Sequence, residues 1–241
     1  MITIVITTYN RVHKLFQCLE SINSNQVNEI LIFNDDEKNK LNIDQVLQNN
    51  PILDYIHIYQ PSDFGFYDRK FRKPFYINKA LEIAKNESVL ISDDDGVFYD
   101  NCIEKHVQGL LKYKFCCGGV IKHRILNKIS ISILQGTNYS INKELFNNIN
   151  GYDEFFINTN GGGDFDFWYR LYQFSKKTAI KLAYIPTAIQ KVSGKSSRKK
   201  SFSNKIKAKE YTLKKHSLDF TGPMYKWSPE IRNKKWMKLI N

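Results

Sequence analysis

Long apolar segments are absent from this sequence of 241 residues, and none of its runs approaches the roughly 18 residues that a membrane span requires. The N-terminal stretch MITIVITTYNR lacks a basic leader, an apolar run and a small-residue cleavage site, so we expect no signal peptide. The cysteines show neither CxxC nor a Cys/His metal spacing; they are Cys18, Cys102, Cys116 and Cys117. Reduced thiols are therefore expected, which favours a cytoplasmic protein.

Acidic residues are in deficit, since 24 Asp and Glu face 36 Lys and Arg, which gives a net charge of +12. The excess is uneven, because segment 191–215 holds ten basic residues and one acid, Glu210. Such a segment suits phosphates, nucleic acid or an anionic membrane surface. A hydrophobic content of 42% excludes a disordered chain, and the length allows one sizeable core.

Short β-branched or apolar runs predict four strands, at 2–7, 29–34, 55–59 and 88–92. Two helices are predicted between them from apolar residues at helical spacing, which are Leu15, Cys18, Leu19 and Ile22 in the first and Ile77, Ala80, Leu81 and Ala84 in the second. Pro74 suits the first turn of the second helix. This alternation predicts an α/β fold with a mostly parallel central sheet flanked by helices.

The pattern is looser after about residue 125. It predicts a short helix from Lys143 to near Gly151, and a glycine-rich loop at 161–163 that leads into a helix. The apolar stripe of this second helix would be Phe167, Leu171 and Phe174. A late strand is predicted within 178–186, and the Ser-, Lys- and Gly-rich segment 193–203 is typical of a mobile loop.

Polar side chains follow each of the four predicted strands, at 8–11, 34–36, 60–63 and 93–95. The carboxyl ends of parallel strands meet at one edge of a sheet, where α/β folds bind ligands. Asp93, Asp94 and Asp95 (the aspartate triplet) repel one another unless a cation offsets their charge, and Mg²⁺ or Mn²⁺ prefers such oxygens. Asp93 and Asp95 would share a face if the strand continued that far. The alternative is a solvated Asp-rich turn with Gly96.

Four segments together resemble the inverting GT-A fold glycosyltransferases of family 2: IVITTYNR, LIFNDD, FRKPFYINKALEIAKNESVLISDDD and GGGDFDFWYRL. The resemblance runs from residue 2 to about 190. It implies a GT-A (Rossmann-like) fold with a nucleotide-sugar-binding subdomain at 1–125 and a smaller acceptor-binding, catalytic subdomain at 126–190. A basic loop and C-terminal helical tail would occupy 191–241.

The resemblance also implies an activity. A sugar would pass, with inversion, from a nucleotide diphosphate donor, most simply a UDP-sugar, to a glycan or lipid-linked glycan acceptor in polysaccharide biosynthesis. Mn²⁺ or Mg²⁺ would assist, held by a DXD motif in which Asp95 is the main ligand and Asp93 lies beside it. Asp93 and Asp94 would also lie near the ribose and the waters of the metal.

Other donor contacts implied by the resemblance come from the earlier strand ends. Thr8 and Tyr9 would line the pocket for uracil or another base, Arg11 would bind the nucleotide, and Asp35 would accept a hydrogen bond from the base. The alternatives are a turn and a packed ring for the first two residues, and a helix N-cap for Asp35. Arg72 would contact the diphosphate; it could instead be a solvated loop cation, and the neighbouring basic residues that could replace it are Arg69, Lys70 and Lys73.

Inverting transfer needs a carboxylate that takes the proton of the acceptor hydroxyl. By resemblance to relatives with a Gly-Gly-Glu-Asp motif, Asp164 is this base, although Gly163 stands where the Glu would be. The alternative for Asp164 is simple N-capping. Asp166 and Trp168 are expected to contact the acceptor, with first-turn stabilisation and core packing as their respective alternatives.

The sequence departs from the family pattern a second time, at the position of a metal ligand. Many relatives carry a metal-binding His near the position of Gln190, so the metal would be weakly held. Segment 191–200 either closes over the diphosphate or is solvated.

The basic, Trp-containing segment 225–240 predicts an amphipathic helix that touches an anionic membrane or docks on the core. The competing functions are a nucleic-acid-binding module at 191–215, which has only Phe202 and Tyr211 as aromatic residues, and a catalytically degenerate nucleotide-binding protein.

Overall fold

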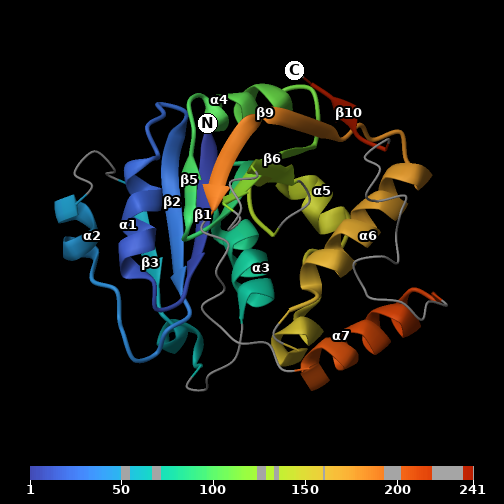
Figure 1. Cartoon of the computed structure of the whole chain (residues 1–241), viewed down its shortest axis with the longest axis horizontal. Coiled ribbons are helices and arrows are strands. Elements are labelled where there is room, and N and C mark those ends of the chain that lie inside the picture. Colours follow the sequence, from blue (N-terminus) through green and yellow to red (C-terminus); the bar gives the residue numbers. More distant parts are fainter. Residues whose placement is uncertain are drawn as a thin grey trace.

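One mixed sheet with helices on both faces forms the body of the protein (Figure 1). The computed structural model describes residues 1–49, 55–66, 72–123, 129–132, 136–159, 161–192, 202–218 and 236–240. None of the helices within these ranges has both the length and the apolar character needed to cross a membrane.

The first part of the sheet is parallel and alternates with helices, as predicted. Its strands are β1 (Ile2–Thr8), β2 (Val27–Asn34), β3 (Ile56–Tyr59) and β4 (Ser88–Asp93), and they pair in the order β4-β1-β2-β3. The connecting helices are α1 (Val12–Glu20), α2 (Ile43–Asn49) and α3 (Lys73–Ile83), with the short 3-10 helix η1 (Pro61–Phe64) before α3. The carboxyl ends of these strands therefore lie at one edge.

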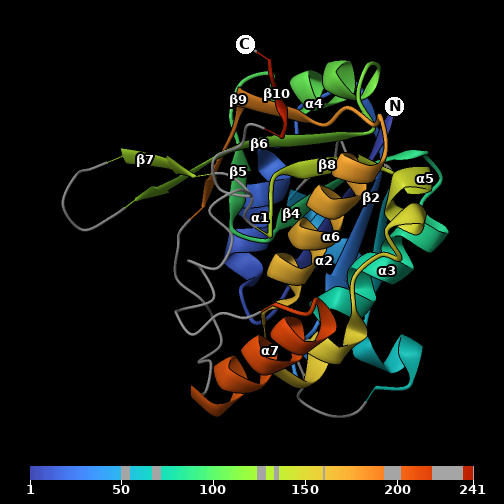
Figure 2. The ribbon, with the colours of Figure 1, turned by 90° about the vertical axis from the view of Figure 1, so that its right-hand side faces the viewer.

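The second part of the sheet mixes directions. In chain order it contains β5 (Gly96–Phe98), α4 (Cys102–Leu110), β6 (Phe115–His123), β7 (Ile129–Ser132), β8 (Tyr139–Asn142), α5 (Lys143–Asn148), η2 (Glu154–Thr159), α6 (Gly163–Lys177), β9 (Ala183–Val192), α7 (Phe202–Lys215) and β10 (Lys238–Leu239). β8 lies antiparallel between β4 and β6, whereas β9 lies between β6 and β10 and is parallel to both. The antiparallel hairpin of β6 and β7 extends beyond the rest of the sheet (Figure 2).

Side-chain alternation along the central strands divides the core between the two faces of the sheet. Ile4 and Ile6 pack with residues of α1 and α4, whereas Val5 packs on the opposite face with residues of α3 and α6. Because helices cover both faces, these strands appear in the sequence as continuous apolar runs. The predicted subdomain boundary near 125 lies outside the described residues, and β8 and β9 from beyond it join the same sheet.

The late strand begins and ends later than its predicted range of 178–186. Pro186, which has no backbone N–H to donate, falls where the pairing of β9 with β6 shifts from Ile185 to Ile189. The irregularity tolerates the proline, so the strand continues to Val192. Sequence periodicity alone did not reveal this extension.

The last third of the chain also differs from expectation. α7 already begins at Phe202, so the predicted loop of 193–203 is wrong at its end, while 193–201 lie outside the described residues. In the tail, Lys238 and Leu239 form a strand that pairs in parallel with β9, so the predicted helix is wrong there. Trp236 packs edge-on against Tyr172 at 5.6 Å. The described end of the tail thus docks on the core, which was the alternative to membrane contact for this segment.

Candidate active site

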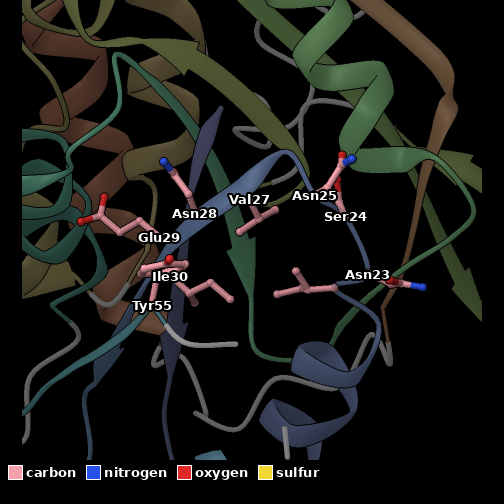
Figure 3. Close-up of a pocket in the computed structure, with 9 residues that line it drawn as sticks. Asn23, Ser24, Asn25, Val27, Asn28, Glu29, Ile30 and Tyr55 are labelled. Atoms are coloured by element: carbon pink, nitrogen blue, oxygen red, sulfur yellow. The ribbon is translucent and has the colours of Figure 1, made fainter. Parts of the chain in front are cut away.

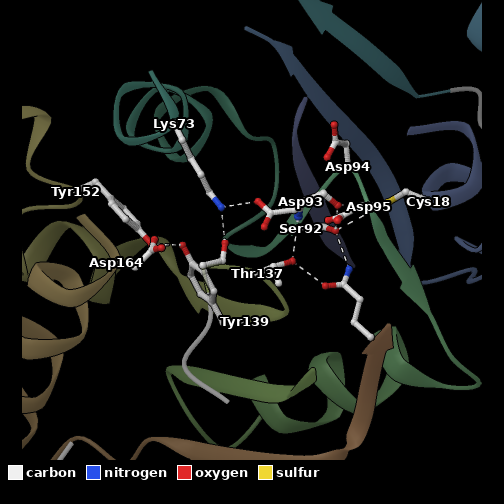
Figure 4. A network of polar contacts seen from close by, with 12 residues as sticks. Cys18, Lys73, Ser92, Asp93, Asp94, Asp95, Thr137, Tyr139, Tyr152 and Asp164 are labelled. Carbon is white, nitrogen blue, oxygen red and sulfur yellow. Dashed lines mark hydrogen bonds and ion pairs between the residues drawn. The ribbon is translucent and has the colours of Figure 1, made fainter. Parts of the chain in front are cut away.

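The aspartate triplet lies where β4 ends, and Lys73 reaches it from α3 (Figure 4). Arg11 pairs with the other two carboxylates of the triplet. The ammonium of Lys73 lies 2.5 Å from Oδ1 of Asp93. The guanidinium of Arg11 donates from Nε to Oδ2 of Asp94 at 3.1 Å and from Nη1 to Oδ2 of Asp95 at 3.3 Å. β4 stops at Asp93, so the alternation that would have given Asp93 and Asp95 a common face does not reach Asp95.

Asp94 is the buried member of the triplet and ties two strand ends together. Its side chain is fully buried, and it accepts a hydrogen bond of 2.7 Å from the hydroxyl of Thr8 at the end of β1. Burial raises the pKa of Asp94 to about 6, although Arg11 and Thr8 both lower it. Thr8 therefore contacts the triplet through Asp94, while Tyr9, also predicted to line the base pocket, is half-buried.

Lys73 connects the triplet to the second carboxylate centre. It is the first residue of α3, and its Nζ donates to the carbonyl oxygen of Gly136 at 2.6 Å as well as to Asp93. Burial lowers the pKa of Lys73, but the nearby carboxylates of Asp93 and Asp164 raise it above its ordinary value. The ammonium is therefore charged at neutral pH. Of the basic residues that the sequence left open, Lys73 lies beside the triplet, whereas Arg69 and Lys70 lie outside the described residues.

Arg72 is buried, so the alternative of a solvated loop cation is wrong. Only 1% of Arg72 is exposed, and its Nη1 lies 3.0 Å from Oδ1 of Asp35 while its Nη2 lies 3.4 Å from Oε1 of Glu37. Asp35 also accepts hydrogen bonds from the backbone N–H of Arg72 at 3.2 Å and from the hydroxyl of Tyr76 at 3.2 Å. Asp35 and Arg72, both predicted donor contacts, thus form one buried pair.

Asp164, the predicted base, lies next to this cluster. It stands in the first turn of α6, whose N-cap is Gly162 with φ of 102° and no side-chain cap, so the N-cap alternative for Asp164 is wrong. The hydroxyl of Tyr152 donates to its Oδ1 at 3.4 Å. The Cα of Gly136 packs so closely that an added Cβ would lie 2.7 Å from its Oδ2. A single glycine therefore separates Asp164 from the ammonium of Lys73.

Asp166, two residues further, is wholly engaged inside the protein. It is fully buried and contacts Nε of Arg170, Nζ of Lys215 and Nε2 of His216 at 2.8, 2.8 and 2.9 Å. Burial raises its pKa, but the hydrogen bond from His216 and the charges of Arg170 and Lys215 outweigh this effect and lower it to about 2. These contacts support the first-turn alternative, and acceptor contact by Asp166 stays a prediction.

Trp168 lies in the core, which was the alternative to acceptor contact for this residue. It is 3% exposed and packs edge-on against Tyr139 and Phe115, with ring centroids 5.0 and 5.7 Å away. A sugar would need a rearrangement to reach its indole ring. The predicted contact between Trp168 and an acceptor therefore has no support from the packing and stays a prediction.

Gln190, predicted to lie near the position of the metal-binding His of many relatives, instead bonds to Ser92 and Thr137 next to the triplet. It is fully buried, donates to the hydroxyl of Ser92 at 2.7 Å and accepts from the hydroxyl of Thr137 at 2.7 Å. Thr137 in turn accepts from the backbone N–H of Asp93 at 2.9 Å. Neither Ser92 nor Thr137 was predicted: Ser92 directly precedes Asp93 in the sequence, whereas Thr137 lies next to no residue with a predicted role.

Carboxylates of the triplet fit a weakly held hard cation. Within the described ranges no three His, Cys, Asp or Glu side chains converge as a metal cluster, and Gln190 is occupied. Asp95 and Asp93 stay the predicted oxygen ligands. Mg²⁺ and Mn²⁺ commonly use one or two carboxylates together with phosphate oxygens and water. Such an ion would have to share these side chains with Arg11 and Lys73.

Other features lie apart from this cluster. A hollow at the amino end of β2 is lined by residues such as Asn23, Asn28 and Tyr55, at the sheet edge opposite the triplet (Figure 3). His106 is buried and bonded to Ser140 and Asn138, so it is an ordinary polar core residue. All four cysteines are free and buried.

Comparisons with known proteins agree with this arrangement. The sequence profile of glycosyl transferase family 2 matches residues 3–176, whereas no curated protein sequence matches the chain. The mannosyltransferase PcManGT from Pyrobaculum calidifontis, solved with GDP-Man and Mn²⁺, superposes with a TM-score of 0.58 at 13% identity, over 93% of this chain and 66% of that one. TarS from S. aureus gives 0.60 at 13% identity, over 98% and 44%.

Identities this low show a shared fold and no more, and the chain spans less than two thirds of either structure. The profile match, however, covers well over half of the sequence, including the aspartate triplet and Asp164. The chain belongs to glycosyl transferase family 2.

Proposed function

We propose that this protein is an inverting glycosyltransferase that moves a sugar from a nucleotide diphosphate donor to a glycan or lipid-linked glycan acceptor. The observation that carries the proposal is that Asp93 and Asp164 border the same Lys73–Gly136 contact. The proposed donor carboxylate and the proposed base carboxylate thereby flank one small region. Single-displacement transfer requires this arrangement, because the donor and the acceptor hydroxyl meet between them.

The proposed step uses Asp164 as the base. The acceptor hydroxyl gives its proton to Asp164 while its oxygen forms a bond to the anomeric carbon of the sugar. The bond from that carbon to the diphosphate oxygen breaks at the same time, and the nucleoside diphosphate leaves with the electron pair. When bound, Mn²⁺ or Mg²⁺ supplies positive charge that stabilises this leaving group. Asp95, with Asp93, would hold the ion.

The donor would lie along the strand ends. Thr8, Tyr9 and the Asp35–Arg72 pair are the proposed base and nucleotide contacts, and Arg11 would face the diphosphate from the other side of the triplet. UDP is our first choice of nucleotide. Because PcManGT was solved with GDP-Man, GDP is tested alongside it. Residues 126–190 would receive the acceptor, and we place the enzyme in polysaccharide biosynthesis in the cytoplasm, with peripheral contact at the inner face of the membrane.

The nucleic-acid alternative finds no support in the contacts of Tyr211. Tyr211 is the aromatic residue of segment 191–215 whose side chain is described, and its ring stacks on Phe155 with centroids 3.6 Å apart. Its hydroxyl is bonded to Asp153 at 2.6 Å. A ring held in this way is not available to stack on a base. The basic face of α7 alone would give only salt-sensitive, unspecific binding.

A substitution of Asp164 tests the proposal directly. We expect Asp164→Asn to lower the turnover of a UDP- or GDP-sugar by about 10²–10⁴-fold, because general-base catalysis contributes on this order. Nucleoside diphosphate release is the assay, with glycans or water as acceptor, and Mn²⁺ present. Exposed Asp100, changed to Asn, is the control for loss of one negative charge.

The outcomes separate the alternatives. Full turnover by Asp164→Asn would refute the assignment of the base. A wild-type protein that binds UDP or GDP in a thermal-shift assay, yet turns over no nucleotide sugar with any acceptor, would be the catalytically degenerate protein. Binding to nucleic acid that weakens steeply with salt, without nucleotide binding, would overturn the enzyme proposal.

A further inference from the structure

The start of α3 carries two cations where helices disfavour them. Arg72 is the N-cap and Lys73 the first residue of the helix, and no acidic residue lies in the first turn. The N-terminus of a helix is its positive end, so a buried cation there is unfavourable by itself. Arg72 is nevertheless buried and Lys73 largely so, with 1% and 11% of the side chain exposed. Each must therefore be balanced by carboxylates from elsewhere in the fold.

The two cations are balanced by different carboxylates. Arg72 is matched by Asp35 and Glu37, which belong to the loop after β2. Lys73 is matched by Asp93 of the aspartate triplet, at 2.5 Å, and its remaining contact of 2.6 Å goes to the neutral carbonyl of Gly136. Of these two cations, Lys73 is therefore the one that pairs with a carboxylate of the aspartate triplet.

Arg11 likewise pairs with the other two carboxylates of the triplet, Asp94 and Asp95. It binds Asp94 through Nε and reaches Asp95 at 3.3 Å. The three negative charges at the end of β4 therefore meet two cations of the chain itself. This explains how the carboxylates tolerate one another in the fold without a metal ion. It also means that Lys73 and Arg11 already contact the carboxylates that a divalent ion would use.

We propose that Lys73 is a built-in counter-ion of Asp93 that competes with a divalent cation for this carboxylate and couples metal binding to donor binding. A metal ion that binds alone must displace the ammonium from Asp93 and leave it buried beside a carbonyl. A donor diphosphate offers new oxygens to the displaced ammonium, so metal and nucleotide bind cooperatively. The second half of this inference rests on the proposed function; the first half does not.

The coupling has an expected size. Coupling between two ligands through one shared group is typically about 5–150-fold in affinity. We therefore expect UDP or GDP to tighten Mn²⁺ binding to the wild-type protein by at least about fivefold. Lys73→Met frees Asp93, so it is expected to bind Mn²⁺ about fivefold or more tightly than the wild type without nucleotide, and to lose most of the coupling.

The experiment is a titration of free Mn²⁺ by electron paramagnetic resonance, with purified protein and without any sugar donor. Lys79→Met is the matched control, because Lys79 lies on the same helix and pairs with Glu82 at 2.7 Å, away from the triplet. It should bind Mn²⁺ as the wild type does. Lys73→Arg keeps the charge and should also retain wild-type affinity. The titration is then repeated with UDP and with GDP.

The results decide the inference whatever the fate of the proposed function. Lys73→Met with wild-type or weaker Mn²⁺ affinity would overturn it. Should that variant fail to fold, Lys73→Gln, which can still donate to Gly136, takes its place, and Mn²⁺ affinity no higher than that of the wild type would again overturn the inference. If neither UDP nor GDP binds, the donor proposal fails, but the comparison without nucleotide still tests whether Lys73 competes for Asp93.

Discussion

Loss of the charge on Asp166 is expected to destabilise the fold markedly. The carboxylate is fully buried and holds together three groups from two parts of the chain, Arg170 on α6 and Lys215 and His216 at the end of α7. In Asp166→Asn the shape is kept, while three donors lose their anionic partner. Nη2 of Arg170 is already buried without a hydrogen-bond partner among the described residues, so little compensation is available.

The magnitude follows from the pKa of Asp166. Contacts in the fold lower it from 3.8 to about 2. Each pKa unit corresponds to about 1.4 kcal/mol, so the ionised form contributes about 2 kcal/mol at neutral pH. Because the folded pKa is lowered, this stability is fully present above pH 4 and is lost as the pH falls through about 2. Leaving buried cations unpaired adds to the loss, so we expect a total of about 2–4 kcal/mol.

Urea denaturation at pH 7, followed by circular dichroism, measures this difference between wild type and Asp166→Asn. Asp100→Asn, at an exposed position, is the control and should change the free energy of unfolding by less than about 0.5 kcal/mol. Repeating the measurement from pH 5 down to pH 2 should reduce the difference between wild type and Asp166→Asn. A loss below about 0.5 kcal/mol at pH 7, or a difference that grows in acid, would refute the reasoning.

Two further predictions concern buried polar groups. Burial lowers the pKa of His106 to about 4, so the stability from its neutral ring is complete above pH 6.5 and is lost as the pH falls through 4. Thermal unfolding between pH 4 and 7 should show this loss, up to about 3 kcal/mol, in the wild type and not in His106→Gln; parallel profiles would contradict it. Tyr211→Ala removes the stack on Phe155 and the bond to Asp153, so trypsin should cut α7 about tenfold faster than in Tyr211→Phe, which keeps the stack. Equal cleavage rates would show that this contact does not hold α7.

Much of the first half of the fold was predictable because its signals are local. Apolar runs and helical spacing predicted β1 to β4 and the helices α1 and α3, and the structure confirms their order and parallel pairing. The polar residues that follow these strands meet at one edge for the same reason. Buried parallel strands leave continuous apolar runs in the sequence, and such runs can be identified without knowing their neighbours.

The elements that were mistaken depend on partners distant in the chain. The strand β10 forms because it pairs with the beginning of β9, at Ala183 and Tyr184. No local sequence pattern predicts this contact. α7 has a low apolar content. Its packing depends on polar contacts to Asp153 and Asp166, made by Tyr211, Lys215 and His216. For segments of this kind, tertiary contacts outweigh local propensity.

The sequence by itself determined which acidic residues gather at the strand ends and that a second acidic pair opens a later helix. Only the tertiary structure decided what each carboxylate meets. It paired Asp93 with Lys73, paired Asp94 with Arg11 and Thr8, and set Asp164 across one glycine from the same ammonium. The physical reason is that side-chain identity is local, whereas burial and charge pairing join residues dozens of positions apart, and the pairing decides which carboxylate is free to react.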